Sequence, residues 1–541
     1  MKKIFLLLNQ KYTAPVVVLI ALACRIVNIM LVSFAGRDKM LLVLQSKNFL
    51  EGKGLGIQKY FTDNLDSPVY DFTQLWPPGY SLLLTPFLKI FNYNIYWATT
   101  AFDIVFSIAL IFIVRKICQQ INFPVAATNL MTLITGCFEY PFIGASLPTD
   151  TVSLFFMLVG ISFALKVVVS KQNSWGLIFL TGFFLFLPCA FRYAYPPIVM
   201  SVPAAIFLYG WMAKNKALQW KGFLTGGIAG VMIATLFITL KSYTGEAGYI
   251  LQTERGYFLE NLIHWYPVVP GSLINFPFLS SQAIKITRMS FKDVMLLLEI
   301  INAIAVAIVA FLVVYWIFFK KIFREMSLGK WLMLFGIACS ASIFLSLGWL
   351  SFTYSAQKGF IDNWNYIYEA RYYALVIMFL QLGFLSWIFL YNKWEKSFWQ
   401  KTIISICALV LFVEVSHSIY FQTKVAFNFK EYKSSVYREQ DYNYFNELLS
   451  RLEKENPAHE ILVAAPGDDF YTYTAAYYGK KGIFDAPKLK QGVPKVKKPS
   501  LLIVMLYNEE LQDYASLIVN PGVKMIKQID YSNFYLIELI P

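Results

Sequence analysis

The carboxylate of Asp38 is a candidate catalytic base. It lies just beyond the first long apolar segment, in the stretch GRDKMLLVLQSKNFLEGKGLG. Apolar residues recur there at helical spacing and Gly52 and Gly54 follow, so we predict a short helix in the membrane interface. That helix would hold Asp38 near a lipid headgroup. The simpler interpretation is a solvated acid, because exposed acids usually carry no chemistry.

Three arginines are candidate ligands for a phosphate group. They are Arg192 in AFRYAYPP, Arg255 in QTERGYF and Arg371 in YEARYY, all at expected outer ends or loops of the membrane part. A guanidinium binds phosphate through two parallel hydrogen bonds, which favours arginine at such a site. For Arg371 an equal alternative is an interfacial side chain that reaches toward the headgroups and pairs with Glu369.

Other charged residues lie within or beside apolar segments. Arg25 and Asp103 fall at similar depths in the first and second segments, and an intramembrane charge is costly unless it is paired. We therefore predict that these two side chains meet in a structural ion pair. Asp150, in SLPTD, has three compatible roles: it binds donor or acceptor, orients Asp38, or caps its own helix.

The elements that must position these residues are membrane-spanning helices. The chain is 57% hydrophobic and 15% charged, against about 25% charged in soluble proteins. Apolar runs long enough to span recur along the first four-fifths of the sequence. Hydropathy predicts about eleven spans, near 15–35, 95–116, 123–143, 149–169, 174–191, 194–212, 221–240, 294–318, 331–352, 372–391 and 402–421.

Basic residues predict the orientation of these spans. Every short turn on the side of the N-terminus is basic, which places that side in the cytoplasm. The long connections near 36–94, 241–293 and 353–371 then lie outside, as does the tail after an odd number of spans. From Lys430 onward the chain holds 14 basic and 15 acidic residues, so all of the positive excess behind the net charge of +14 lies in the membrane part. This distribution indicates anionic lipid headgroups and excludes a nucleic-acid surface.

The tail predicts a small extracytoplasmic α/β domain, residues 429–541, after a membrane domain of residues 1–428. Strands are expected at EILVAA (460–465) and SLLIVML (500–506), with a closing hairpin of KMIKQI and FYLIELI. Helices are expected near 437–454, 468–479 and 508–519. No nucleotide-binding fingerprint is present, and the six cysteines lack the spacing of a disulfide framework or zinc site.

The order of four segments resembles the GT-C membrane glycosyltransferases, and more narrowly the protein O-mannosyltransferases and lipid A aminoarabinose transferases. These segments are GRDKMLLVLQSKNFLEGKGLG, WPPGYSLLLTPFLKIF, SLPTDTVSLFF and EARYYALVIMF, within the first 390 or so residues. The resemblance implies transfer of a sugar from a polyprenyl-phosphate donor to a hydroxyl of a lipid, glycan or protein acceptor at the outer face of a cell membrane. Asp38 matches the family's first-loop base, which implies inversion at the anomeric carbon. No cofactor is certain, and a divalent cation is compatible with the acidic first loop.

The motif WPPGY predicts the start of a helix near residues 79–91. Proline at a helix start costs little, while Trp76 and Tyr80 suit the interface, and Tyr80 is a candidate substrate-binding residue. This helix is too short to span, so we expect it to fold back and help to cover a cavity. An ordinary turn into a transmembrane helix is the alternative, which the short length opposes.

Two other classes of protein fit parts of the sequence. A transporter or flippase for lipid-linked glycans would show inverted repeats and broken helices at the midplane. The sequence shows no internal repeat, and the candidate residues gather on one face. A non-catalytic assembly or sensor protein would place its function in the tail. Replacing Asp38 with Asn distinguishes both from a transferase.

Overall fold

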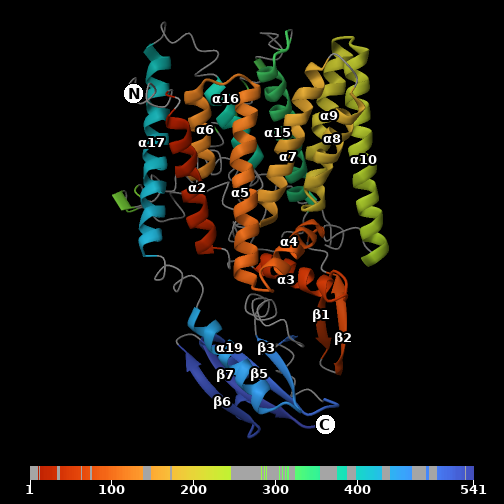
Figure 1. Ribbon diagram of the computed structural model, residues 1–541, viewed down its shortest axis with the longest axis vertical. Coiled ribbons are helices and arrows are strands. Elements are labelled where there is room, and N and C mark those ends of the chain that lie inside the picture. Colours follow the sequence, from red (N-terminus) through yellow and green to blue (C-terminus); the bar gives the residue numbers. More distant parts are fainter. Residues whose placement is uncertain are drawn as a thin grey trace.

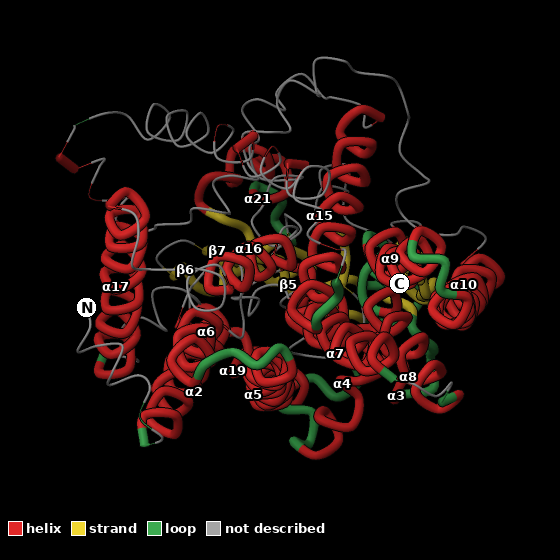
Figure 2. The backbone as a smooth tube through the Cα atoms, turned by 90° about the horizontal axis from the view of Figure 1, so that it is seen from above, coloured by secondary structure: helices red, strands yellow, loops and turns green. Residues whose placement is uncertain are grey.

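Long apolar helices account for most of the described residues in a computed structural model. They run side by side, and the sheet of the C-terminal segment lies beyond one end of the bundle (Figure 1). Seen end-on, α2, α5, α6 and α7 are neighbours (Figure 2). The structure describes residues 12–32, 37–61, 64–72, 76–137, 148–170, 174–244, 325–353, 374–386, 398–428, 439–465, 483–485, 496–529 and 532–541, with residue 10 and isolated positions between 282 and 323.

Ten of the predicted spans coincide with helices of the described residues. These are α2 (Thr13–Val32), α5 (Ile95–Gln120), α6 (Val125–Cys137), α7 (Pro148–Val169), α8 (Trp175–Phe186), α9 (Tyr195–Met212), α10 (Lys216–Thr244), α15 (Leu328–Thr353), α16 (Ala374–Ser386) and α17 (Phe398–Phe427). The span expected near 294–318 lies outside the described residues apart from isolated positions. Six of the described helices are long and apolar enough to cross a membrane. The chain is therefore a multi-pass membrane protein, while the count of eleven spans stays a prediction.

The helices pack through apolar side chains and a few close backbone contacts. Residues of α5, α6, α7, α9, α15 and α16 form one large apolar core. At Gly136 the backbone of α6 lies so close to Ala21 of α2 that a Cβ would overlap it. Buried Lys221 of α10 donates hydrogen bonds to the carbonyls of Val167 and Ser170, at 3.0 and 2.5 Å. Both carbonyls lie at the C-terminal end of α7, where the helix backbone offers no further N–H donor.

The predicted short helix after the first span is α3 (Arg37–Leu50). Gly52 and Gly54 follow it with φ of 75° and 76°, a conformation that favours glycine. The Asn48 amide then donates to the carbonyl of Gly56 at 2.6 Å and ties α3 to the next element. The side chains from Lys39 to Asn48 are all buried, so α3 is enclosed by protein instead of lying open in the interface.

An antiparallel hairpin follows α3. This hairpin was not predicted from the sequence. Its strands are β1 (Gly56–Phe61) and β2 (Asn64–Phe72), paired from Gly56 with Phe72 to Phe61 with Asn64. The hairpin projects from the bundle toward the C-terminal sheet (Figure 1), where β1 contacts β4. Two segments that are far apart in the sequence therefore meet beyond the end of the bundle.

The predicted helix of the WPPGY motif is α4 (Gly79–Ile90), which begins directly after Pro78. It contacts α3, α5 and α7, so it lies across the end of the bundle instead of entering it. Gly79 lies against the backbone of Ala190 in the 3-10 turn η1 (Leu187–Ala190), where a Cβ would overlap the Ala190 carbonyl. Glycine at this position is what allows α4 to pack so closely on η1.

The C-terminal segment forms a five-stranded mixed sheet with the order β4-β3-β5-β7-β6. Helix α19 (Glu439–Glu455), β3 (Glu460–Ala465), β5 (Ser500–Tyr507), β6 (Val523–Ile529) and β7 (Ser532–Leu539) lie where the sequence predicted them. The third predicted helix is instead a 3-10 turn, η7 (Asn508–Tyr514), with one helical turn, α21 (Ala515–Ile518). Strand β4 (Ile483–Asp485) was not predicted, and the helix expected at 468–479 lies outside the described residues.

Alternate residues of the central strands bury opposite faces of this sheet. Leu502 and Val504 pack with Leu517 of α21, whereas Leu501 and Ile503 pack with Leu448 of α19. A strand buried on both faces has a continuous apolar sequence, as SLLIVML does. The hydrogen-bonded pairing of β3 with β5 is parallel, and that of β5 with β7 is antiparallel.

The contact at Gly79 makes a prediction about stability. Gly79→Ala should destabilise the protein by about 1–3 kcal/mol, because the added methyl must push α4 away from η1. Thermal unfolding in detergent measures this as a lower midpoint. Gly176→Ala is the matched control, since no atom lies within 4 Å of that Cβ position and alanine favours the helix. Equal midpoints for the two variants would show that the α4–η1 contact is loose.

Candidate functional site

The predicted site residues fall into two groups. Tyr80, Asp150 and Arg192 are described with their side chains, and Asp38 is described by its backbone in the first turn of α3. Arg255, Glu369 and Arg371 lie outside the described residues, so their roles stay predictions. All four described residues belong to elements at the end of the bundle that faces the C-terminal sheet (Figure 1), which we call the sheet-facing end.

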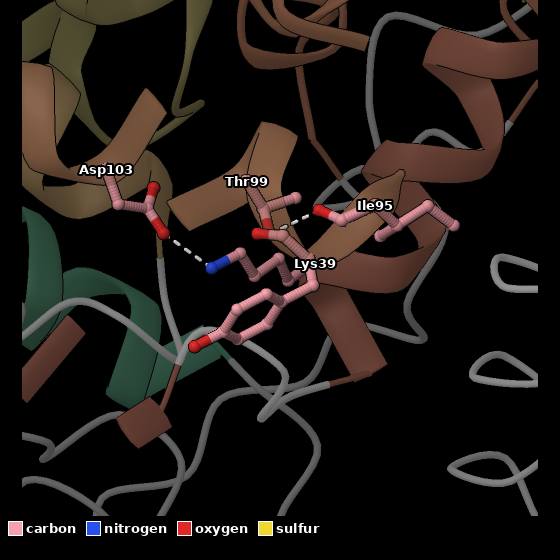
Figure 3. Close-up of polar contacts among 5 residues, drawn as sticks. Lys39, Ile95, Thr99 and Asp103 are labelled. Atoms are coloured by element: carbon pink, nitrogen blue, oxygen red, sulfur yellow. Dashed lines mark hydrogen bonds and ion pairs between the residues drawn. The ribbon is translucent and has the colours of Figure 1, made fainter. Parts of the chain in front are cut away.

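A buried ion pair joins Lys39 of α3 to Asp103 of α5. The Lys39 Nζ lies 2.5 Å from the Asp103 Oδ2 (Figure 3), and the two residues are 0% and 6% exposed. Thr99, one turn earlier on α5, donates its hydroxyl to the carbonyl of Ile95 at 2.8 Å (Figure 3). Burial lowers the pKa of the Lys39 ammonium, and the neighbouring Asp103 carboxylate raises it again.

This ion pair corrects the prediction that Asp103 meets Arg25. Asp103 does find a cation, but the cation comes from α3 and not from the first span. The reason is that α3 is enclosed at the end of the bundle, so the lysine side chain reaches Asp103 about two turns inside α5. The sequence signal was Asp103 itself, since a carboxylate within an apolar segment requires a cation. Lys39 was not considered because it lies outside every predicted span.

Tyr80 of α4 is buried beside the same ion pair. Its ring packs edge-on against Phe102, with 4.8 Å between the ring centroids. Its hydroxyl is near Asp103, and no hydrogen bond of standard geometry to a described residue satisfies it. Burial raises the pKa of Tyr80 well above its usual value, and the Asp103 charge adds to this shift. Tyr80 therefore stays a neutral hydroxyl at all pH values near neutrality.

Asp150 and Arg192, predicted as separate ligands, form a second buried ion pair. Asp150 lies in the first turn of α7, where a negative charge is favoured by the helix dipole. Arg192 follows η1 in the turn before α9. The Oδ2 atom of Asp150 and the hydroxyl of Ser153 are buried without a hydrogen-bond partner among the described residues. These two oxygen atoms are therefore potential hydrogen-bond acceptors at the sheet-facing end.

A separate apolar cluster holds both ion pairs in place. It combines residues of α3, α4 and the first turns of α5 with Val152 of α7 and Phe191 beside Arg192. Hydrogen bonds between α3 and α4 reinforce it: the Ser81 hydroxyl lies 2.9 Å from Gln45 Oε1 and 3.0 Å from the Leu42 carbonyl. The Lys39 and Asp150 pairs are therefore parts of one packed unit.

Metal ligation is not supported within this unit. Among the residues that the structure describes, no three histidine, cysteine or acidic side chains gather as a metal site would require. The acids Asp66 and Asp71 lie on β2, and only their backbone is described. A divalent cation therefore stays a prediction of the acidic first loop.

Comparison with solved structures shows that the chain shares the fold of an ArnT protein. The ArnT protein of Cupriavidus metallidurans bound to undecaprenyl phosphate matches with a TM-score of 0.52 and 11% identity, covering 97% of this chain and 98% of that one. Its apo structure gives 0.49 and 11%, covering 94% and 95%. The Archaeoglobus fulgidus oligosaccharyltransferase with zinc and sulfate gives 0.46 and 12%, covering 94% and 70%.

The resemblance expected from the sequence is thus confirmed at the level of the fold. No protein-family model matches the sequence, and comparison with curated protein sequences found no match. The shared fold extends over both the helical part and the C-terminal segment, because nearly all of each chain is covered in the ArnT comparison.

Because the Lys39–Asp103 pair is buried, breaking it should lower stability, and the exposed Lys53–Glu51 pair provides the control. Lys39→Met should destabilise the protein by about 3–5 kcal/mol, because it leaves the Asp103 carboxylate buried and unpaired. Lys53→Met removes the same kind of contact, since Lys53 Nζ also lies 2.5 Å from Glu51 Oε2, but those side chains are 38% and 34% exposed. That change should cost at most about 1 kcal/mol.

Thermal unfolding midpoints of the two methionine variants, measured in the same detergent, give the comparison. Equal midpoints would contradict the assignment of Lys39 to a buried ion pair.

Proposed function

We propose that the protein is a membrane glycosyltransferase that moves a sugar from a polyprenyl-phosphate donor to an acceptor hydroxyl at the outer face of the membrane. The observation that carries this proposal is the match over nearly the full length of both chains to an ArnT structure that holds undecaprenyl phosphate. The sequence resemblance to GT-C enzymes, built on segments spread over the membrane part, supports it independently.

Asp38 is proposed as the general base of this reaction. It accepts the proton of the acceptor hydroxyl while that oxygen attacks the anomeric carbon of the donor sugar. The bond from the anomeric carbon to the phosphate oxygen breaks, and polyprenyl phosphate leaves with the electron pair. Because the leaving phosphate is already stable as an anion, no second nucleophilic carboxylate is needed. Attack opposite the leaving group inverts the anomeric configuration.

Arginines are proposed to stabilise the charge that develops on the phosphate. Arg192 is supported by its place at the sheet-facing end, in the same packed unit as α3. A guanidinium matches the geometry of phosphate oxygens through paired N–H donors, which favours arginine in this role. Arg255 and Arg371 are proposed in the same role from the sequence, with Glu369 beside Arg371.

Asp150 and Tyr80 are proposed as substrate-binding residues. A buried, unsatisfied carboxylate oxygen is a strong acceptor for a sugar or acceptor hydroxyl, and Asp150 Oδ2 has that character among the described residues. The Tyr80 hydroxyl keeps its proton and can act as a donor. We further propose that the N-terminus is cytoplasmic, that residues 429–541 form an extracytoplasmic domain, and that the membrane is the cytoplasmic membrane of the cell.

Loss of the Asp38 carboxylate should remove turnover while the fold persists. Asp38→Asn should lower the rate by at least about 100-fold, the lower end of what general base catalysis contributes. The assay follows consumption of a panel of polyprenyl-phosphate sugars by purified protein, with the thermal midpoint as the test of folding. Glu51→Gln is the matched control, an exposed acid just after the other end of α3. A transporter would be little affected by Asp38→Asn, so an unchanged rate contradicts the proposal.

The stereochemistry of the product tests the single-base mechanism separately. With a donor of defined anomeric configuration, the product should carry the opposite configuration, read from the one-bond carbon–proton coupling in its NMR spectrum. Retention would require a covalent glycosyl-enzyme intermediate and hence a second carboxylate acting as nucleophile. That result would remove Asp38 from the role of sole base without removing the transferase activity.

A further inference from the structure

The Lys39–Asp103 ion pair is adjacent in the sequence to the proposed base. Asp38 and Lys39 are consecutive residues in the first turn of α3, so their Cα atoms are about 3.8 Å apart. We propose that the Lys39–Asp103 pair is a positioning device that fixes the first turn of α3 against α5 and thereby sets the place of Asp38 relative to the donor. This inference rests on the proposed function only in taking Asp38 as the base.

The contact joins α3 to α5, two helices that are far apart in the sequence. The Lys39 Nζ reaches 2.5 Å from the Asp103 Oδ2, across a sequence separation of 64 residues (Figure 3). Asp103 lies on α5, one of the long membrane-spanning helices, about two turns from its start. A spanning helix is a rigid support, whereas the end of a short helix is prone to fray. The pair thus fixes the position of the first turn of α3 relative to α5.

Hydrogen bonds to α4 act further along α3. Ser46 donates to the carbonyl of Ser81 at 2.9 Å, and Ser81 donates to Leu42 and Gln45. These contacts fix the second and third turns on α4. They hold α3 to α4 further along the helix, whereas the Lys39 contact acts in the first turn, beside the buried Met40. A positional error of about 1 Å at a reacting group can lower a rate by roughly 100-fold.

The competing interpretation is that the pair only stabilises the bundle. The two interpretations differ for an apolar replacement of both partners. Replacing a buried ion pair with apolar side chains of similar volume is often neutral or stabilising. Such a replacement keeps the packing but loses the direction and length of the contact. A purely structural pair would then be replaceable without effect on turnover, whereas a positioning pair would not.

Kinetics of Lys39→Met/Asp103→Leu provide the first test. We expect the thermal midpoint to return close to the wild-type value while kcat falls about 10- to 100-fold, with KM for the polyprenyl-phosphate sugar changed less than threefold. Asp103→Asn alone should lower both the midpoint and kcat. A double variant whose kcat lies within twofold of wild type would overturn the positioning role and leave the proposed transferase function intact.

Distances within the protein provide a second test that needs no activity. Nitroxide labels at Arg37→Cys and Tyr93→Cys report the first turn of α3 against the turn before α5, where Tyr93 is 44% exposed. Protein without the two introduced cysteines is the labelling blank, since the five described cysteines are buried. Pulsed dipolar spectroscopy should give one narrow distance distribution in the parent and a broader or shifted one in the double variant.

The two tests separate the possible failures. An unchanged distance distribution in the apolar double variant overturns the positioning role whether or not turnover is detected. A changed distribution in a protein that consumes no polyprenyl-phosphate sugar supports the positioning of α3 and contradicts the proposed function. If the double variant fails to fold, Lys39→Arg takes its place, because it keeps the charge but changes the reach. The expected result is then a retained midpoint with a lowered kcat and a shifted distance, and wild-type values for both overturn the role.

Discussion

A buried charge at the end of a membrane bundle must find an opposite charge, and this constraint organises the sheet-facing end of the protein. Asp103 lies inside an apolar spanning helix, where an unpaired carboxylate would be very costly. Lys39 satisfies it because α3, which follows the first span, is enclosed by protein. Enclosing α3 in turn requires α4 to fold across the bundle, which the close contact of Gly79 with Ala190 permits. The location of Asp38 follows from these contacts.

The same end of the bundle gathers the described residues to which the proposed reaction assigns roles. A second buried ion pair, Asp150 with Arg192, shares an apolar cluster with α3 and α4. The hairpin of β1 and β2 extends from α3 through the Asn48–Gly56 hydrogen bond and contacts β4 at the edge of the C-terminal sheet. The C-terminal segment is thus in physical contact with the loop that carries Asp38.

Much of the fold could be predicted from the sequence because its signals are local. Long apolar runs predicted the long helices, the two prolines before Gly79 predicted the start of α4, and the continuous apolar run SLLIVML predicted β5. The hairpin was missed because Pro68 and several acids weaken the strand pattern of β2. The partner of Asp103 was missed for a different reason. The position of a charge within an apolar segment predicts how deep it lies in the membrane. The partner that it meets depends on how the connecting segments fold around the bundle.

The proposed mechanism requires the lipid phosphate to bind at the sheet-facing end, between the turn that carries Arg192 and the first turn of α3. A cryo-electron microscopy structure of the full chain in nanodiscs with added undecaprenyl phosphate tests this directly. We predict phosphate density within hydrogen-bonding distance of the Arg192 guanidinium, with the Asp38 side chain facing the same space. Phosphate density at the opposite end of the bundle, or an Asp38 side chain turned away from the phosphate, would contradict the account.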